Sequence, residues 1–467
     1  MNASENVAAD ARPLVVNAEP GNVVGRRSEA LTLVLLLLAT TLVRLAVILA
    51  RWDQFDADPD GYRLIAESLA NSGIYGRPLG GPDSGGPLFA TAYRPPLYPL
   101  ILSTFVRKGQ VPHAAVATLH VFAALATVTC VYRLGCNLGL GRAATLAAFG
   151  VACDPILLNQ STLVMTETLA AFFVAFTLYL GERLSRRRDF KHAFSLGAAL
   201  GVAALCRPTF LPFAGLAVIG CLFLAAPRGR RLGLATCMAI AVLLSVSPWI
   251  VRNQRVFDRW IATTTHGGYT LLLGNNPDFY QHLAAAPRGE PWLLPTDDYL
   301  MEQCRELHSE MVAPRINLSG SEQELFDDAL AYYCAREHIH AHPEQFVRAC
   351  FYRVGQFWNP LPHAMSEEES TSRAVVRWSI AVWYVAIYSA IVVTIWQRRH
   401  LLGRRPWRQR GSFPWLLLIL VVFSFAAAHV TYWSNLRMRG PIMPALYLLA
   451  ASALVGGTTP RPPAPET

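Results

Sequence analysis

Long apolar runs, interrupted by short polar segments, dominate the pattern of this chain. A helix needs roughly 20 predominantly apolar residues to cross a bilayer. The run of about a dozen residues after Arg94 is too short for this and opens with two prolines, so we expect an interfacial helix there. The pattern predicts ten crossings, over residues 31–50, 112–134, 141–158, 165–182, 193–206, 209–226, 233–249, 375–396, 413–431 and 441–456.

Basic residues alternate with these runs in a way that fixes an orientation. With the N-terminus inside, the inner loops include ERLSRRRDFK, PRGRRLG and QRRHLLGRRPWRQR, which are strongly basic. The short outer loops around residues 159–166 and 206–208 hold only Arg207 as a basic residue. This distribution follows the positive-inside rule. Two large segments, 51–111 and 252–374, then lie outside, and any chemistry is expected on that face.

The predicted fold class is an all-α polytopic membrane protein with about ten transmembrane helices and both termini cytoplasmic. We expect interfacial helices in the first outer loop and a small, mostly helical outer domain. The expected organisation is a disordered tail 1–30, a transmembrane core 31–250, an outer domain 251–374, C-terminal transmembrane helices 375–457 and a disordered tail 458–467.

Composition supports a membrane protein and argues against a nucleic-acid partner. Of 467 residues, 53% are hydrophobic and 16% are charged, whereas soluble domains carry roughly 25% charged residues. The net charge of +9 is explained by the arginines of the inner loops. Three of the nine cysteines, Cys304, Cys334 and Cys350, lie in the outer domain, and the sequence does not decide whether two of them pair. The first apolar run is interpreted as a retained anchor.

Four aspartates follow the first apolar run directly: Asp53, Asp56, Asp58 and Asp60. The stretch DGYRLIAESLANSG predicts an amphipathic helix, with Gly73 suited to end it. Either Asp58 or Asp60 would serve as the N-cap of this helix, which accounts for one acid only. Carboxylates at a membrane boundary are also what a general base or a metal-assisted transfer requires. Asp58 and Asp60 are therefore the first catalytic candidates.

Four arginines on the outer side are candidates for binding a phosphate. Arg94, in TAYRPPLYP, is held by two prolines at the start of the interfacial helix. A guanidinium binds phosphate through paired hydrogen bonds; the alternative is contact with lipid headgroups. Arg252 stands where the chain leaves the membrane and would meet a second phosphate oxygen. Arg437 and Arg439 lie outside against the positive-inside bias, which makes them further candidates.

Glu167 lies at the outer end of the apolar run 165–182. An acid at this depth is costly unless it faces the interior of the bundle, and such acids are functional by default. Glu167 is the third catalytic candidate, with an interhelical hydrogen bond as the alternative. Asp154, which precedes Pro155, fits a helix-end residue.

The order of these motifs resembles one family. An acidic pair after the first span is followed by a basic residue with Pro-Pro-Leu, then by Thr-Glu-Thr-Leu at 166–169 and Pro-Trp-x-x-Arg-Asn at 248–253. The chain resembles the integral-membrane GT-C glycosyltransferases, in particular the branch containing the protein O-mannosyltransferases and the aminoarabinose–lipid A transferases. The resemblance covers residues 31–277, and the last span with its preceding arginines more loosely.

The resemblance implies a sugar transfer from a polyprenyl-phosphate donor to an acceptor at the outer face. The family's catalytic pattern is Asp-Glu-x-x-Tyr; Asp58 keeps the spacing to Tyr62, but the second acid is displaced to Asp60. This leaves open which aspartate is the base. Arg94 matches the basic residue that handles the lipid phosphate. Tyr93 stands where some relatives place an acid, so no catalytic acid carries over there.

The implied mechanism is an inverting transfer: Arg94, with Arg252, neutralises the leaving phosphate, and one aspartate deprotonates the acceptor. Asp58 and Asp60 also have the form Asp-x-Asp, which in some GT-C enzymes holds a divalent cation, whereas closer relatives are described as working without one. The expected partners are a polyprenyl-phosphate-linked sugar, a lipid, glycan or protein acceptor, and membrane lipids. The expected location is a bacterial inner membrane with the site facing the periplasm. The alternatives are a polyprenyl-linked glycan ligase or polymerase, and a lipid or sugar transporter.

Overall fold

The computed structural model describes residues 20–79, 85–285, 292, 297–312, 318, 320–363, 369–402 and 411–455. Within these ranges, six segments are long and apolar enough to cross a membrane: Ser28–Ala50, His113–Asn137, Arg228–Phe257, Thr371–Gln397, Phe413–Thr431 and Leu436–Val455. Helices make up nearly all of the secondary structure of these ranges. The expected all-α polytopic membrane fold is confirmed, whereas the number of ten crossings and the cytoplasmic termini stay predictions.

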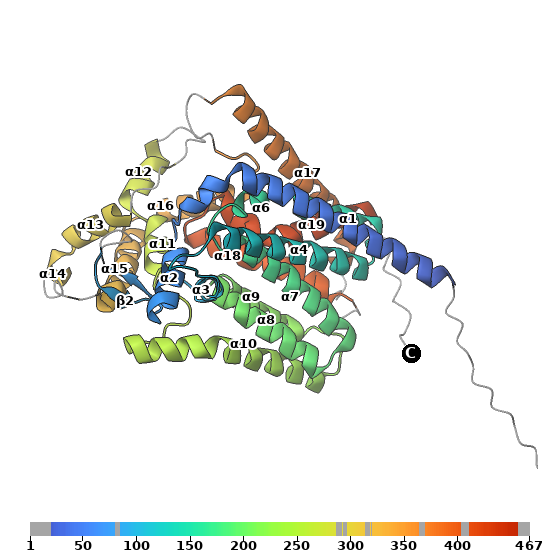
Figure 1. Cartoon of the computed structure of the whole chain (residues 1–467), viewed down its shortest axis with the longest axis horizontal. Coiled ribbons are helices and arrows are strands. Elements are labelled where there is room, and N and C mark those ends of the chain that lie inside the picture. The colour runs from blue at the N-terminus through green and yellow to red at the C-terminus, as the bar shows by residue number, and fades with distance from the viewer. Residues whose placement is uncertain are drawn as a thin grey trace, which may run out of the picture.

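The long helices form one bundle (Figure 1). They are α1 (Pro20–Ala50), α4 (His113–Asn137), α7 (Glu167–Arg187), α8 (Phe190–Cys206), α9 (Phe210–Cys221), α10 (Arg228–Phe257), α17 (Thr371–Leu402), α18 (Phe413–Thr431) and α19 (Met443–Ala451). Helix α1 includes residues 20–30, which the sequence assigned to a tail; residues 1–19 and 456–467 of the two predicted tails lie outside the described residues. Helices α8 and α10 approach closely because Gly197 and Gly201 have no Cβ. A Cβ at either position would clash with atoms of α10.

The run 141–158, predicted as one crossing, is not a single continuous helix. Helix α5 (Arg142–Cys153) ends at Asp154, and a separate short helix α6 (Pro155–Gln160) begins there. Proline has no backbone N–H and clashes with the preceding turn, so it starts a helix more readily than it continues one. The Asp154 carboxylate accepts a hydrogen bond of 2.8 Å from the backbone N–H of Leu157, as expected for a helix-end residue.

The first outer segment is small and compactly folded. It contains η1 (Trp52–Asp56), α2 (Tyr62–Ser72), the antiparallel strands β1 (Gly76–Pro78) and β2 (Leu88–Ala90), and α3 (Leu97–Ser103). Gly73 ends α2 in a left-handed conformation with φ 73°, as the sequence predicted. Helix α3 has 7 residues, too few to cross a bilayer.

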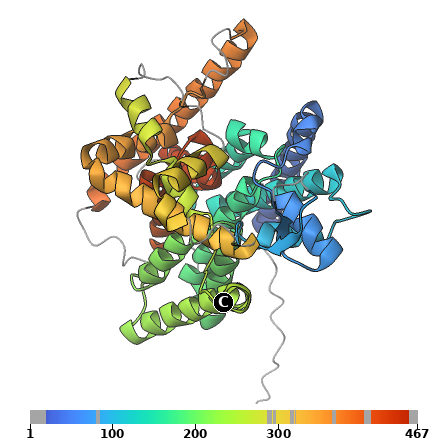
Figure 2. The ribbon, with the colours of Figure 1, turned by 90° about the vertical axis from the view of Figure 1, so that its left-hand side faces the viewer.

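The second outer segment is a helical cluster with its own core. It comprises α11 (Gly267–Leu273), α12 (Pro277–Ala285), α13 (Asp297–Leu307), α14 (Ser309–Val312), α15 (Gly320–Ala341) and α16 (Pro343–Trp358). Figures 1 and 2 show that both outer segments lie at the same end of the bundle, with α15 beside the hairpin. The short helix η4 (Leu436–Ile442), ahead of α19, also carries candidate arginines. The fold therefore gathers the candidate residues at one end.

Candidate functional site

Asp58 lies in the turn that leads into α2, where its carboxylate is largely shielded from water. Its Oδ2 accepts a hydrogen bond of 3.0 Å from the backbone N–H of Leu64 in the first turn of the helix. Its Oδ1 is buried and has no hydrogen-bond partner among the described residues. Burial raises the pKa of Asp58, although the backbone hydrogen bond from Leu64 opposes the shift. The helix-capping contact therefore occupies one oxygen and leaves the other for chemistry.

Asp60 and Arg94 form an ion pair across the first outer segment. The Nη2 of Arg94 lies 2.9 Å from the Oδ1 of Asp60, and its Nε donates to the backbone carbonyl of Asp60 at 2.8 Å. The two side chains remain 13% and 22% exposed. The guanidinium also lies over the rings of Tyr62 and Tyr93. Asp60 thus fixes the direction in which Arg94 presents its positive charge.

The loop before Arg94 is held by an acid of the outer domain, Glu324 on α15. Its carboxylate accepts hydrogen bonds from the backbone N–H of Ala92 at 2.9 Å and from the hydroxyls of Thr91 and Thr265, each at 2.5 Å. It is 4% exposed. Glu324 is not among the residues predicted from the sequence, because an acid in a polar helix shows no local sign of a partner 232 residues away.

Glu167 is the first residue of α7 and is 1% exposed. Its Oε1 lies 3.0 Å from Nη1 of Arg207, between α8 and α9, and 3.1 Å from Nε of Arg437 on η4. Glu167 therefore joins three parts of the bundle through ion pairs. This role is similar to the interhelical hydrogen bond that was the alternative to a catalytic role. Arg207 was not among the predicted site residues, although its position as the basic residue of the short outer loops was a usable signal.

Tyr62 connects the two charged groups. Its buried hydroxyl lies within electrostatic range of Arg94 and Asp60, and also of Arg207 and Glu167. Burial raises the pKa of Tyr62 well above its usual value, so the hydroxyl stays protonated and uncharged. The fold thus brings the predicted residues of the first outer loop and the third catalytic candidate into one region.

Two predicted phosphate ligands make other contacts. Arg252 donates to the backbone carbonyls of Thr91 and Tyr75 at 2.8 and 3.0 Å, bracing the first outer segment. Arg439 is fully buried and donates to the carbonyl of Phe357 at 2.8 Å. These contacts give both arginines a bracing role in the structure.

The candidate metal pair does not fit a divalent cation. Asp60 already contacts the guanidinium of Arg94, which would repel a cation at the same carboxylate. Among the described residues, no group of three or more His, Cys, Asp or Glu side chains is placed to hold a metal ion. The transfer proposed for this site uses no metal ion.

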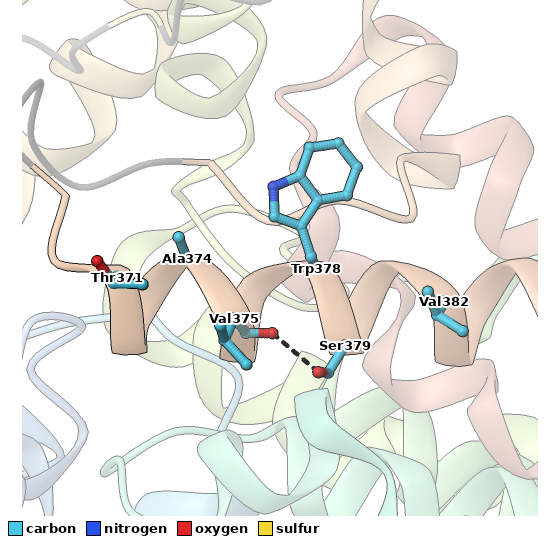
Figure 3. A pocket seen from close by; sticks show the side chains of 6 residues that line it. All are labelled: Thr371, Ala374, Val375, Trp378, Ser379 and Val382. Atoms are coloured by element: carbon cyan, nitrogen blue, oxygen red, sulfur yellow. Dashed lines mark hydrogen bonds between the residues drawn. The ribbon is translucent and has the colours of Figure 1, made fainter.

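A cavity of about 500 Å³ lies against the first part of α17 (Figure 3). The hydroxyl of Ser379 is turned back to the carbonyl of Val375 at 2.8 Å. No lining side chain is ionisable, so the cavity supplies neither acid, base nor phosphate ligand. Its lining residues are Thr371, Ala374, Val375, Trp378, Ser379 and Val382.

Residues 93–251 match the family described as dolichyl-phosphate-mannose-protein mannosyltransferase. The matched region begins beside Arg94 and includes Glu167 and Arg207. No curated protein matches the chain.

Solved structures of AglB, an archaeal oligosaccharyltransferase from Archaeoglobus fulgidus, have a similar fold. The complex with an inhibitory peptide and a dolichol-phosphate has a TM-score of 0.50 and 16% identity, over 91% of this chain and 50% of that chain. The structure tethered with an acceptor peptide containing the NVT sequon has a TM-score of 0.52 and 16% identity, over 91% and 49%. The chain thus spans about half the length of the oligosaccharyltransferase.

ArnT from Cupriavidus metallidurans, bound to undecaprenyl phosphate, aligns with 94% of this chain and 78% of its own, at 14% identity and a TM-score of 0.38. The family match covers about a third of the chain, and the likeness to the oligosaccharyltransferase shows a shared polytopic helical fold.

Proposed function

We propose that the protein transfers a sugar from a polyprenyl-phosphate donor to a lipid, glycan or protein acceptor at the outer face of a bacterial inner membrane. One observation carries this proposal: a shielded carboxylate with one buried, unpaired oxygen, Asp58, stands two residues from an acid that orients a partly exposed arginine. This combination supplies a base and a phosphate ligand within one short segment. The expected orientation, with both outer segments on the face opposite the basic loops, supports the location.

Arg94 is the proposed ligand of the donor phosphate. A guanidinium that is 13% exposed and oriented by Asp60 can exchange part of its contact with the carboxylate for a phosphate oxygen. Charge that develops on the leaving phosphate is then neutralised without moving the arginine. Arg437, paired with Glu167 and 29% exposed, is the proposed second cation facing the same region. Glu167 is proposed to position that cation and Arg207.

Asp58 is the proposed general base. Its raised pKa makes it a stronger base than an ordinary aspartate, and its Oδ1 has no hydrogen-bond partner among the described residues that would compete for a proton. The acceptor O–H or N–H proton passes to Asp58 as the acceptor atom bonds to the anomeric carbon. The bond from that carbon to the phosphate oxygen breaks at the same time, which inverts the configuration and releases polyprenyl phosphate.

The proposal is tested with the purified full-length chain in liposomes that contain radiolabelled polyprenyl-phosphate sugars and inner-membrane lipid extract. The expected result is label transferred to an acceptor together with release of polyprenyl phosphate. Transfer only from polyprenyl diphosphate-linked oligosaccharides would instead support the ligase alternative. Movement of the intact labelled lipid between leaflets, without cleavage, would support the transporter.

A further inference from the structure

Two buried cysteines of the outer domain face each other. Cys304 on α13 is 3% exposed, and Cys334 on α15 is 1% exposed. Both belong to the same hydrophobic core, and their thiols hydrogen-bond to each other. Helices α13 and α15 pack together at this point. The two thiols, which are free in this structure, therefore already interact where α13 packs on α15, as a disulfide between these positions requires.

The remaining cysteine of the segment is placed differently. Cys350 lies on α16 and contacts the guanidinium of Arg353, whose Nη2 is 3.3 Å from its sulfur. The other six cysteines of the chain lie in or beside the apolar runs of the bundle. The sequence left the pairing of Cys304, Cys334 and Cys350 open, and the packing selects one pair.

We propose that Cys304 and Cys334 form a disulfide that fastens α13 to α15, leaving Cys350 as a free thiol. The proposal rests on the proposed function in one respect, because it requires the outer domain to lie in an oxidising compartment such as the periplasm. The closed loop is about 30 residues long, a length at which cross-linking restricts the unfolded chain substantially. The same helix α15 carries Glu324, so the bridge would also steady the residue that holds the loop before Arg94.

The oxidant is a disulfide, either of a thiol–disulfide oxidoreductase or of oxidised glutathione. The Cys334 thiol donates a hydrogen bond to the Cys304 sulfur, which lowers the pKa of Cys304 and raises that of Cys334. The Cys304 thiolate attacks the donor disulfide, forms a mixed disulfide and releases one thiol. The Cys334 thiol then loses its proton and attacks the Cys304 sulfur, releasing the second thiol. Two electrons and two protons pass to the donor, and burial later shields the bridge from reductants.

The test uses the wild-type chain in native membranes, denatured with excess N-ethylmaleimide and digested without reductant. Mass spectrometry should find a peptide pair joined through Cys304 and Cys334, and Cys350 alkylated. A chain in which Cys304 and Cys334 are both alkylated overturns the proposal. Purified protein incubated with oxidised glutathione should form the same pair in a Cys350→Ser variant.

A topology readout separates this outcome from a failure of the proposed function. Glu322 is exposed on α15, and Glu322→Cys in intact cells should react with a membrane-impermeant maleimide. If Glu322→Cys is labelled but the wild-type pair is alkylated, the disulfide is wrong and the outer orientation stands. If Glu322→Cys is protected and the pair is alkylated, the disulfide and the outer-face site both fail.

Discussion

A substitution at Glu324 should loosen the loop before Arg94 without changing any residue of that loop. In Glu324→Gln, the amide oxygen can still accept the hydrogen bonds from Ala92 and Thr265, but these bonds then go to a neutral group. The amide NH2 group replaces the oxygen that accepts from Thr91, and the ion pair with Arg77 at 3.5 Å is lost. Hydrogen bonds to a charged group contribute about 1.5–3 kcal/mol, against about 1 kcal/mol for neutral ones. The loop should therefore open about 2 kcal/mol more easily, equivalent to roughly thirty-fold.

Hydrogen exchange at the Ala92 amide measures this opening, because this N–H donates to Glu324. We expect roughly thirty-fold faster exchange in Glu324→Gln, and a similar loss of affinity for the donor with a smaller effect on turnover. Glu322→Gln, which removes an exposed charge from the same helix, is the matched control and should leave exchange unchanged. Unchanged exchange at Ala92 in Glu324→Gln, or equal acceleration in the control, would refute the role of Glu324 in holding the loop before Arg94.

Three further predictions concern other residues. Asp60→Asn should reduce transfer about fivefold, because the loss of one partly exposed ion pair costs about 1 kcal/mol while the backbone carbonyl still orients Arg94; complete loss would make Asp60 the base. Arg207→Ala should destabilise the bundle by about 3–5 kcal/mol because it leaves the buried Glu167 with one cation fewer, and Glu167→Gln in the same chain should recover part of the thermal stability. Burial raises the pKa of Asp328 to about 6, above the pKa that it has in the unfolded chain. The stability contributed by its protonated carboxyl is therefore fully present below the unfolded pKa and is lost as pH rises through about 6. The thermal unfolding midpoints of wild type and Asp328→Asn should diverge over this range, and parallel pH profiles would contradict this prediction.

Local patterns determined much of the fold. Apolar runs predict the helices of the bundle. The spacing of Tyr62, Ile65, Ala66 and Leu69 predicts one face of α2, on which the first three are buried and Leu69 is half-buried. The Gly73 helix end followed from backbone conformation alone. The helix end at Asp154 was expected from the proline that follows it, but the apolar run 141–158 gave no sign that a separate helix begins there.

The partners of the charged residues could not be predicted, because they come from distant parts of the chain. Motif order indicated Asp58, Asp60, Arg94 and Glu167, but no local pattern states that Arg94 pairs with Asp60 or that Glu167 holds two arginines. The sequence therefore left open which aspartate is the base. The two carboxylates differ in their folded surroundings: Asp60 has an arginine partner, whereas Asp58 keeps one buried oxygen without a hydrogen bond.

The assignment of Asp58 as the general base is tested by the variant Asp58→Asn. Donor binding and sugar transfer are both measured for this variant and for Arg94→Ala. General base catalysis contributes about 10²–10⁴-fold, so Asp58→Asn should bind polyprenyl phosphate like wild type while losing transfer by at least about a hundredfold. Arg94→Ala should lose donor binding as well as transfer. Transfer at the wild-type rate by Asp58→Asn would contradict the account, because the base would then have to be another residue.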